Sequence, residues 1–489
     1  MTLFKNCLIA IFLFFVIQPV VSQEAIGLRQ SNYGGIHSSL LNPASNVRAP
    51  IRWDINIVAG GLFVENNYAY FEKASLITLL KKRNDIEFAN STSDEVTSSS
   101  SSLKYNFFDD GRKKQAYFSS FVMGPSVSVH VRDQSFGLYF SARTAGSANR
   151  ISSVLGYYRV TELEDGETFT VNPFKSAEMS WGEVGINYGR MVYENSRHSI
   201  SAGVNFKYLM GFDAVFFQNH SPVNITKNGD NLDFENGNAG FGLASGISYE
   251  NDDASYQFQK NGNGAAVDLG AVFKIKKDEF SPDKYIWKFG VSLLDFGKIS
   301  FKKNTQAHQV VTSDSFRIFH PAYQNLSSED EFFQYTSNES LDNPFASYSN
   351  NRFSLWMPAG ISLQAELAVL NDLYVNATLV RRLRFKKAGV ERENIISITP
   401  RFERRWFEVY LPVVLYNDRD LRFGTAFRLG FFTIGTDNLP SLIIPSKFSG
   451  TDIYFALKIN PFKKNKKLRS GGKGSGKSKN HSGGLNCYY

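Results

Sequence analysis

The sequence predicts an all-β protein: an antiparallel transmembrane β-barrel of about 14 strands, with an N-terminal plug segment and a disordered basic C-terminal tail. Three observations predict this fold. The chain begins with an export signal, it contains no later apolar run long enough for a membrane helix, and its apolar residues alternate with polar ones over many segments of nine or ten residues.

Residues 1–22 have the features of a secretory signal peptide. Lys5 supplies a positive charge, residues 8–17 form a short apolar run, and small residues at 20–22 precede an expected cut at Gln23. Such a leader is removed and takes no part in the fold. The alternative, a retained anchor helix, is the weaker one because no positive flank follows the apolar run.

The charge of the chain is concentrated in its tail. Lys and Arg exceed Asp and Glu by 8, and residues 463–489 contain eight basic residues and no acid. With Lys5 also removed, the remaining body has a net charge of −1, which argues against a nucleic-acid partner. Cys7 leaves with the leader, so Cys487 has no partner for an internal disulfide.

Alternation gives each predicted strand one apolar and one polar face. In residues 285–294, Trp287, Phe289 and Val291 oppose Lys288 and Ser292. The segments are long enough to cross a bilayer at a tilt, whereas strands of a soluble sandwich usually have about five or six residues. Aromatic residues make up 15% of the chain, which is high for a soluble domain. The alternative fold is a soluble all-β secreted protein.

Fourteen segments show this pattern. They are residues 51–59, 64–71, 117–130, 134–143, 179–189, 198–209, 264–275, 285–296, 354–368, 372–382, 393–403, 406–416, 420–435 and 451–459. Four long irregular inserts, including 72–116 and 300–350, fall at even-to-odd connections, and two short links, at 131–134 and 369–372, fall at odd-to-even connections. This asymmetry predicts long loops at one end of the barrel and tight turns at the other.

The polar faces of these strands carry charges of both signs. The candidate lumen charges are Glu183, Lys207, Asp268, Lys288, Glu366, Arg401, Arg422 and Arg428. They could line a route or bind a polar group. The simpler interpretation is a set of ion pairs that hold the plug and wall together, because unpaired charges inside a barrel are costly.

Residues 23–50 are turn-rich and have no strand pattern. Gly34 and Gly35 allow backbone conformations closed to other residues, and Asn42, Pro43 and Ala44 form a compact turn. Such a segment can fold into the barrel as a plug; the alternative is a loose periplasmic leader.

An ordered set of short motifs resembles the long-chain fatty-acid transporter (FadL-like) superfamily of outer-membrane proteins, and more closely an uncharacterised Bacteroidota barrel family within it. The motifs are Ser31–His37, Leu41–Ala44, Gly124–Ser126, Ser180-Trp181 with Glu183 and Tyr188, Gly203 with Lys207–Gly211, and Tyr374–Ala377. The resemblance implies an N-terminal plug at Asn42, Pro43 and Ala44. It transfers no lipid-binding residues, because no matching motif is present.

Motifs for chemistry are not evident in the sequence. It shows no Cys/His metal spacing, no phosphate loop and no hydrolase signature, and so predicts no enzyme activity, no cofactor and no metal site. The expected location is the outer membrane with both termini in the periplasm.

The expected domains are a signal peptide (1–22), a plug segment (23–50), a barrel (51–462) and a basic Gly/Ser/Lys-rich tail (463–489). The tail lacks the apolar content to fold and is expected to be solvated; contact with peptidoglycan is the alternative.

The sequence leaves two functions open. One is passive binding or uptake of a hydrophobic small molecule, which the resemblance implies. The other is a non-transporting partner barrel of an outer-membrane secretion or assembly complex, with outer-membrane or periplasmic protein partners. In both cases the wall contacts outer-membrane lipid.

Overall fold

The computed structural model describes residues 24–82, 86–88, 103–108, 110–156, 164–250, 253–278, 284–326 and 328–460. The predicted signal peptide, the serine run at 98–102 and the basic tail lie outside these residues.

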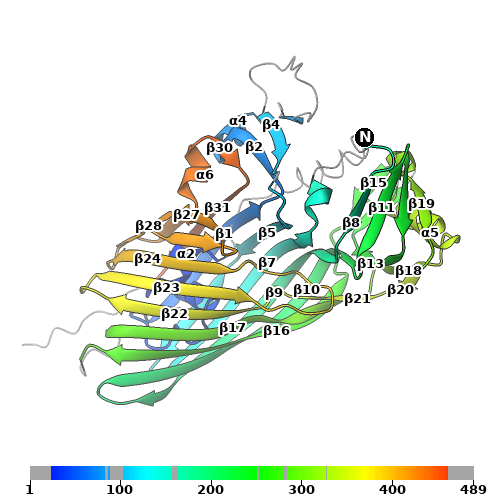
Figure 1. The fold of residues 1–489 in the computed structure, drawn as a ribbon. Coiled ribbons are helices and arrows are strands. Elements are labelled where there is room, and N and C mark those ends of the chain that lie inside the picture. Colours follow the sequence, from blue (N-terminus) through cyan, green and yellow to red (C-terminus); the bar gives the residue numbers. More distant parts are fainter. Residues whose placement is uncertain are drawn as a thin grey trace, which may run out of the picture.

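Antiparallel strands close into a barrel (Figure 1). Within the described residues the wall has fourteen membrane-crossing segments, which we call staves. A stave is either one strand or two consecutive strands separated by a short break. In chain order they are β1 (Trp53–Asn66), β5 with β6 (Lys114–Met123, Ser126–Val131), β7 (Gln134–Ile151), β9 (Phe174–Glu194), β10 (His198–Asn219), β16 (Gly262–Lys276), β17 (Tyr285–Phe301), β21 with β22 (Phe353–Trp356, Gly360–Ala368), β23 (Leu373–Arg382), β24 (Ile395–Glu403), β25 with β26 (Phe407–Tyr410, Val413–Tyr416), β27 with β28 (Asp420–Phe423, Thr425–Leu429), β29 (Phe432–Thr436) and β31 (Gly450–Ile459).

The last strand closes the barrel on the first. β31 pairs with β1 through Ile55 opposite Ile459 and Val58 opposite Leu457. Closure leaves no sheet edge in the membrane, where an unpaired backbone group would be costly. The all-β barrel expected from the alternation is therefore confirmed.

The number of strands matches the prediction, but two boundaries were wrong. Residues 51–59 and 64–71 were expected as two strands; instead one strand, β1, runs straight through Gly60 and Gly61, and 69–74 forms β2 outside the barrel. Residues 420–435 were expected as one strand, but a turn at Gly430, with φ +59°, separates β28 from β29. The two errors cancel in the count.

The merging of the first two expected strands into β1 also changes the numbering of the connections. With β1 as one stave, the four long inserts follow staves 1, 3, 5 and 7, so they are odd-to-even connections, and the short link at 131–134 follows stave 2. They share one end of the barrel, as expected, and we call it the long-loop end.

The inserts were expected to be irregular, but they contain short elements whose pattern is too brief to stand out. These elements are β2 (Ala69–Ala74), α4 (Leu76–Lys81), β3 (Ile86–Phe88), β4 (Leu103–Phe107), η1 (Ser153–Gly156), β8 (Thr168–Val171), β11 (Val223–Asn228), β12 (Asn231–Glu235), β13 (Gly237–Ala244), β14 (Ile247–Glu250), β15 (Asp253–Tyr256), β18 (Thr305–Thr312), β19 (Phe316–Phe319), η3 (His320–Gln324), α5 (Glu329–Leu341) and β20 (Tyr348–Asn350). Two more, α6 (Leu439–Ile443) and β30 (Ser446–Phe448), lie between β29 and β31.

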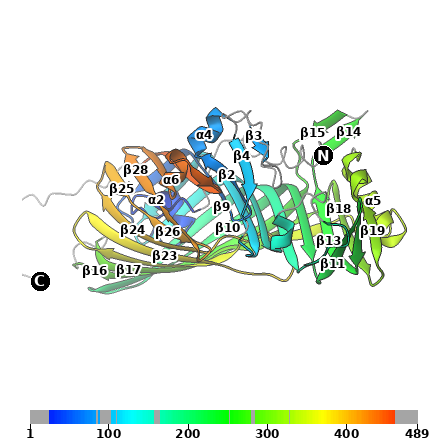
Figure 2. The same cartoon turned by 45° about the horizontal axis from the view of Figure 1, so that its top comes forward.

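Staves differ greatly in length around the barrel. β9 and β10 have 21 and 22 residues, whereas β29 and β31 have 5 and 10. The tall side carries an outer lobe built from the inserts, in which β8, β11, β12 and β19 form a sheet beside α5 (Figure 2). On the short side, β2, β3, β4 and β30 form a small rim sheet next to α4 and α6 (Figure 1).

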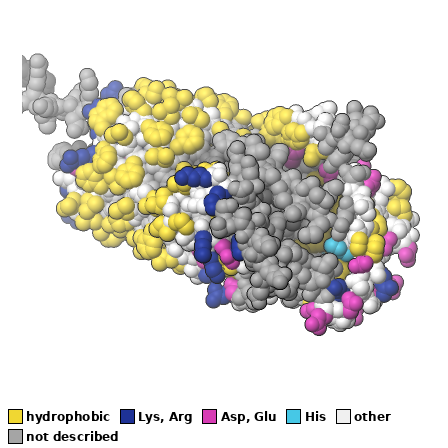
Figure 3. All heavy atoms as spheres, turned by 90° about the horizontal axis from the view of Figure 1, so that it is seen from above, with side chains coloured by type: hydrophobic (Ala, Val, Ile, Leu, Met, Phe, Trp, Pro, Cys, Tyr) yellow, Lys and Arg dark blue, Asp and Glu magenta, His cyan; other side chains and the backbone are white. Residues whose placement is uncertain are grey.

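The outward face of the wall is apolar. Exposed rows such as Trp287, Phe289 and Val291 on β17, or Phe427 and Leu429 on β28, alternate with buried polar residues. Hydrophobic side chains accordingly cover much of the barrel face that Figure 3 shows. A closed barrel with an apolar belt outside and a polar interior is the architecture of outer-membrane barrels.

In the described part of the chain, no helix has the length and apolar character needed to cross a membrane.

Candidate functional site

The N-terminal segment, residues 24–50, lies inside the barrel. It includes two short helices, α2 (Ile26–Arg29) and α3 (Ile36–Ser39), and most of its residues are buried. Hydrogen bonds join it to lumen-facing residues around the wall, for example from Gln30 to Thr378 and from Asn205 to the Ser39 carbonyl. The segment therefore fills the lumen at this level.

A bed of glycines supports the predicted turn. Gly189, Gly203 and Gly270 stand opposite one another on β9, β10 and β16. A Cβ atom on Gly203 would lie 2.5 Å from the Pro43 carbonyl carbon, and one on Gly270 would lie 2.3 Å from the Asn42 Oδ1 atom. Glycine at these positions lets the turn approach the wall backbone directly.

Polar contacts fix the turn on this bed. The Asn42 side chain accepts a hydrogen bond from the Ala44 N–H at 3.0 Å and donates to the carbonyl of Ala271 at 3.1 Å. The Pro43 carbonyl accepts from the Asn187 amide at 3.1 Å. Asn42 thus forms the turn and also joins it to β16, while Pro43 contributes its carbonyl and fixed backbone.

The glycine pair predicted for the segment lies against its own chain and β1. Gly35 has φ +59°, and a Cβ there would lie 2.2 Å from the Asp54 carboxyl group. A Cβ on Gly34 would lie 2.0 Å from Ser38 Oγ. The Ile36 N–H then donates to Asp54 Oδ2 at 3.1 Å, which joins the start of α3 to the first strand.

His37, on α3, is fully buried and bonds through Nε2 to the Asn56 Oδ1 atom at 2.9 Å. Burial lowers the pKa of His37 to about 3, and the positive charge of Lys458 adds to this effect. The imidazole is therefore neutral in the folded protein at physiological pH.

The lumen charges form two groups. In the central cluster, Lys207 lies between two carboxylates, with its Nζ atom 2.7 Å from Asp268 and 2.6 Å from Asp295. Arg143 reaches Asp295 at 3.1 Å and Glu183 at 3.5 Å. Each buried charge here has a partner of opposite sign, as the ion-pair interpretation requires.

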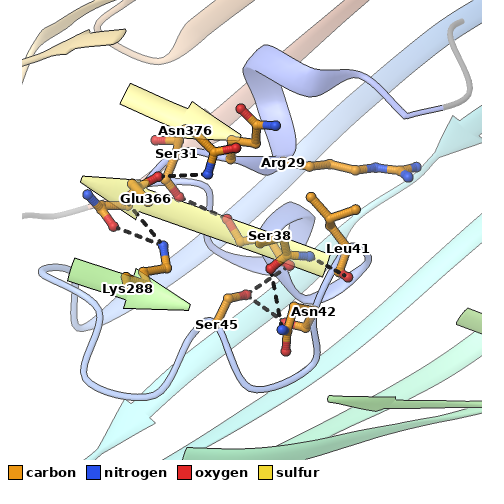
Figure 4. Close-up of a pocket in the computed structure, with 12 residues that line it drawn as sticks. Arg29, Ser31, Ser38, Leu41, Asn42, Ser45, Lys288, Glu366 and Asn376 are labelled. Carbon is orange, nitrogen blue, oxygen red and sulfur yellow. Dashed lines mark hydrogen bonds and ion pairs between the residues drawn. The ribbon is translucent and has the colours of Figure 1, made fainter. Parts of the chain in front are cut away.

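The second group, the basal cluster, surrounds Glu366. Arg401 Nη1 lies 3.0 Å from its carboxylate. Lys288 Nζ lies 3.6 Å from the same group (Figure 4). Arg401 also donates to the Gln30 carbonyl at 2.6 Å. The same cluster continues to Arg428, whose Nη2 lies 2.6 Å from Glu408.

Arg422, the last of the predicted lumen charges, pairs with Glu65 away from both clusters. Sequence reasoning missed Asp295 because a bulge shifts the register between β16 and β17, so alternation cannot assign its side. It also missed Arg392, which lies in a loop and carries no alternation signal.

The loop at 383–394, between β23 and β24, folds inward, and we call it the mouth loop. The Lys175 ammonium of β9 donates to its Phe385 and Lys386 carbonyls at 2.7 and 2.8 Å, and the Glu391 N–H donates to Ser147 of β7. These contacts carry the loop across the lumen to the opposite wall.

Arg392 anchors the mouth loop at the centre of the barrel. It donates to Glu24 at 2.8 Å, to Asp295 at 2.9 Å and to the Pro358 carbonyl at 2.6 Å. A single guanidinium therefore joins the mouth loop, the N-terminal segment and the wall.

A packed cluster of apolar side chains, which we call the apolar chamber, lies above the central cluster and under the mouth loop. Trp181, Leu209 and Ala266 are each two residues from a lumen charge on the same strand, so they also face inward. The buried residues of the chamber are Ala145, Ala177, Met179, Trp181, Leu209, Ala214, Ala244, Ala266, Ile299, Phe301, Leu355 and Met357, and Val390 of the mouth loop packs against them.

Two small cavities lie inside the described part of the barrel. The two best-formed cavities each have a volume of about 20 Å³, room for roughly one water molecule. One lies between the N-terminal segment and the basal cluster, lined by Asn42, Ser45 and Lys288 among others (Figure 4). The other adjoins Arg143, Lys207 and Arg392. The N-terminal segment and the mouth loop therefore fill much of the lumen at the levels where they contact the wall.

Comparison with curated proteins finds no sequence that matches this chain. Solved structures give weak matches. The toluene transporter TbuX of Ralstonia pickettii is 10% identical, over 88% of this chain and 93% of that chain, with a TM-score of 0.36. The toluene transporter TodX of P. putida is 9% identical, over 88% and 95%, with a TM-score of 0.31. The translocator domain of the autotransporter NalP of Neisseria meningitidis is 6% identical, over 85% and 90%, with a TM-score of 0.28. Values this low do not assign an activity.

A protein family with no known function matches residues 43–437, from the turn on the glycine bed to the end of β29. The match covers most of the chain, and the protein belongs to this family, DUF5723.

Proposed function

We propose that this outer-membrane barrel binds hydrophobic small molecules in the apolar chamber and lets them pass without an energy source. The observation that carries the proposal is the chamber itself, because the interior of a membrane barrel is ordinarily polar. Here Trp181, Leu209 and Phe301 turn inward beneath the long-loop end. The resemblance to FadL-like transporters in the sequence supports the same function.

The mouth loop would act as the gate. Val390 occupies the chamber, and two hydrogen bonds with Trp356 hold this part of the loop, at 3.2 Å from the Trp356 N–H to the Ala388 carbonyl and 3.1 Å from the Val390 N–H to the Trp356 carbonyl. A ligand of similar apolar surface replaces Val390 when the loop moves. The N-terminal segment lies below, so the ligand would have to leave without crossing it.

A binding experiment tests this function with the full chain in lipid nanodiscs. The probe is 1-aminoanthracene, and energy transfer from tryptophan reports its binding near the protein. A variant with residues 385–391 replaced by Gly and Ser is expected to bind the probe several-fold more tightly than the wild type. Adding Leu209→Asn should reverse the gain, because it puts an amide in the chamber. Equal binding by all three proteins would refute the proposal.

A partner barrel is the second candidate. It is favoured by the outer lobe, which the chain builds from three inserts on its tall side, and by the largely filled lumen. Mild solubilisation of native membranes followed by affinity capture should then return a stoichiometric partner. Loss of that partner on removal of the lobe strands β11 and β12, with the barrel still folded, would support this role.

We also propose an orientation for the barrel in the outer membrane. With both termini in the periplasm, the long-loop end faces outward and the short turns face inward. Protease added to intact cells should cleave the outer lobe and spare the tail, whose contact with peptidoglycan is tested by fractionation after deletion of 463–489.

A further inference from the structure

The short side of the barrel carries an exposed apolar surface that the lumen does not explain. Helices α4 and α6 contact each other at the rim, and we call their exposed aliphatic residues the rim patch: Ile77, Leu80, Leu439, Ile443 and Ile444. These side chains are 37–55% exposed. Exposed apolar surface of this kind marks an interaction site.

The local sequence explains why these residues face outward. Ser75 caps α4 by accepting a hydrogen bond from the Thr78 N–H at 3.2 Å. Leu79 packs inward against the rim-sheet core of Phe71, Ala74 and Leu103. Ile77 and Leu80, three residues apart, then share the opposite face of the helix.

The rim patch continues the lipid-facing belt. α6 contacts β27, whose Leu421 and Phe423 are exposed on the outer face of the wall. In Figure 1, α6 lies at the rim next to β27 and β31, and α4 lies beyond it near β2, β4 and β30. The patch therefore lies at the level where the apolar belt of the short side ends.

Basic residues flank the patch. Lys73 precedes α4, Lys81 ends it, and Lys447 lies on β30 with its ammonium 4.7 Å from the centre of the Tyr70 ring. Viewed from above, Lys and Arg side chains gather along the border of the hydrophobic belt (Figure 3). Lysines beside an apolar surface fit the phosphate groups of lipid heads, with the aliphatic side chains among the acyl chains.

We propose that the rim patch inserts into the leaflet at the long-loop end and binds anionic, phosphate-bearing lipid through Lys73, Lys81 and Lys447. The occupant is lipid because the patch is continuous with a surface that already contacts lipid. This inference does not depend on what the lumen carries.

Spin labels test the insertion. In a Cys487→Ser background of the full chain in nanodiscs, single cysteines replace Ile443 or Leu80 and carry a nitroxide. Molecular oxygen is expected to reach both labels more readily than a water-soluble nickel complex does. Leu363→Cys on the belt is the lipid-facing control, and Phe345→Cys, exposed on the outer lobe, is the water-facing control.

Two outcomes would overturn the proposal. Labels at 443 and 80 that behave like the label at 345 would place the patch in water. Labels shielded from both reagents would mean that protein, a second copy or a partner, covers it.

Native mass spectrometry tests the headgroup. The triple variant Lys73→Gln, Lys81→Gln and Lys447→Gln should retain phosphatidylglycerol less than the wild type by about tenfold, with retention of an uncharged glycolipid unchanged. The matched control replaces three lysines in or next to β16 and β17, remote from the rim patch, with Gln: Lys260, Lys277 and Lys298. Equal losses in both triple variants would contradict specific binding at the rim.

Discussion

Arg392 and Glu24 form a buried ion pair, with 2.8 Å between Nη1 and Oε1, that joins the mouth loop to the N-terminal segment. Both side chains are almost fully buried. Arg392 also reaches Asp295 of the wall. Through this residue, the mouth loop and the N-terminal segment are both joined to the barrel wall.

Replacing Arg392 should destabilise the barrel. Arg392→Ala leaves Glu24 and Asp295 with less compensation, and breaking a buried pair in this way costs about 3–5 kcal/mol. The exposed pair of Arg381 with Asp418 is the control, and Arg381→Ala should cost less than about 1 kcal/mol. Urea unfolding in detergent micelles measures the loss of unfolding free energy in each variant. Similar losses in the two variants would contradict a stabilising role for the buried Arg392 ion pairs.

The glycine bed makes a second prediction. Gly203→Ala puts a methyl group 2.5 Å from the Pro43 carbonyl carbon, so the turn must leave the wall. We expect trypsin to cut after Arg29 or Arg48 in this variant and bilayer conductance to rise. Gly146→Ala, where the nearest atom lies 3.5 Å away, should behave as the wild type. An intact segment in both variants would refute direct contact.

His37 makes stability depend on pH. Burial lowers its pKa to about 3 in the folded protein, against 6.5 for an ordinary histidine, so the unfolded chain binds the extra proton between these limits. Stability is therefore lost as pH falls below about 6.5, by about 2 kcal/mol between pH 7 and pH 5. His37→Gln should remove this part of the pH dependence in urea titrations. An unchanged slope would show that another group causes it.

Glu393 gives the opposite sign. Burial raises its pKa to about 8 from 4.5, with nearby Glu24 adding to the shift. Between these values the folded protein holds a proton that the unfolded chain has lost, so stability falls as pH rises from about 5 to 8. Glu393→Gln should stabilise the protein at pH 8 by on the order of 3 kcal/mol and have little effect at pH 5. Equal effects at both pH values would count against a protonated Glu393.

The alternation of apolar and polar residues was enough to predict the barrel and its number of strands, because each strand of the wall has one face toward lipid and one toward the lumen. It failed where the period breaks: at Gly60 and Gly61, which look like a turn but continue β1, and at Gly430, which is one. Glycine is found both inside strands and in turns, so the presence of glycine alone could not distinguish a continuous strand from a turn.

The interior was only partly predictable. Glu183, Lys207 and Asp268 could be assigned to one face of their strands. Their partner Asp295 lies at a bulge, and Arg143, the last residue of the expected strand 134–143, lies in the middle of β7. The role of Trp181 and Leu209 could not be predicted from the sequence. A single apolar residue on a polar strand face has no clear meaning until the residues that pack against it from other strands are known. The rim patch depends on two short helices with no period long enough to detect.

The N-terminal segment also contacts the last strand. The Gly27 N–H donates to the Tyr454 hydroxyl at 3.0 Å, and Asn460 donates to the Tyr33 carbonyl at 3.2 Å. Residues just before the first strand thus bind residues in or next to the last strand, so these bonds need the last strand in place. A barrel that has not yet added its last strand would therefore hold its N-terminal segment less firmly than the finished barrel does.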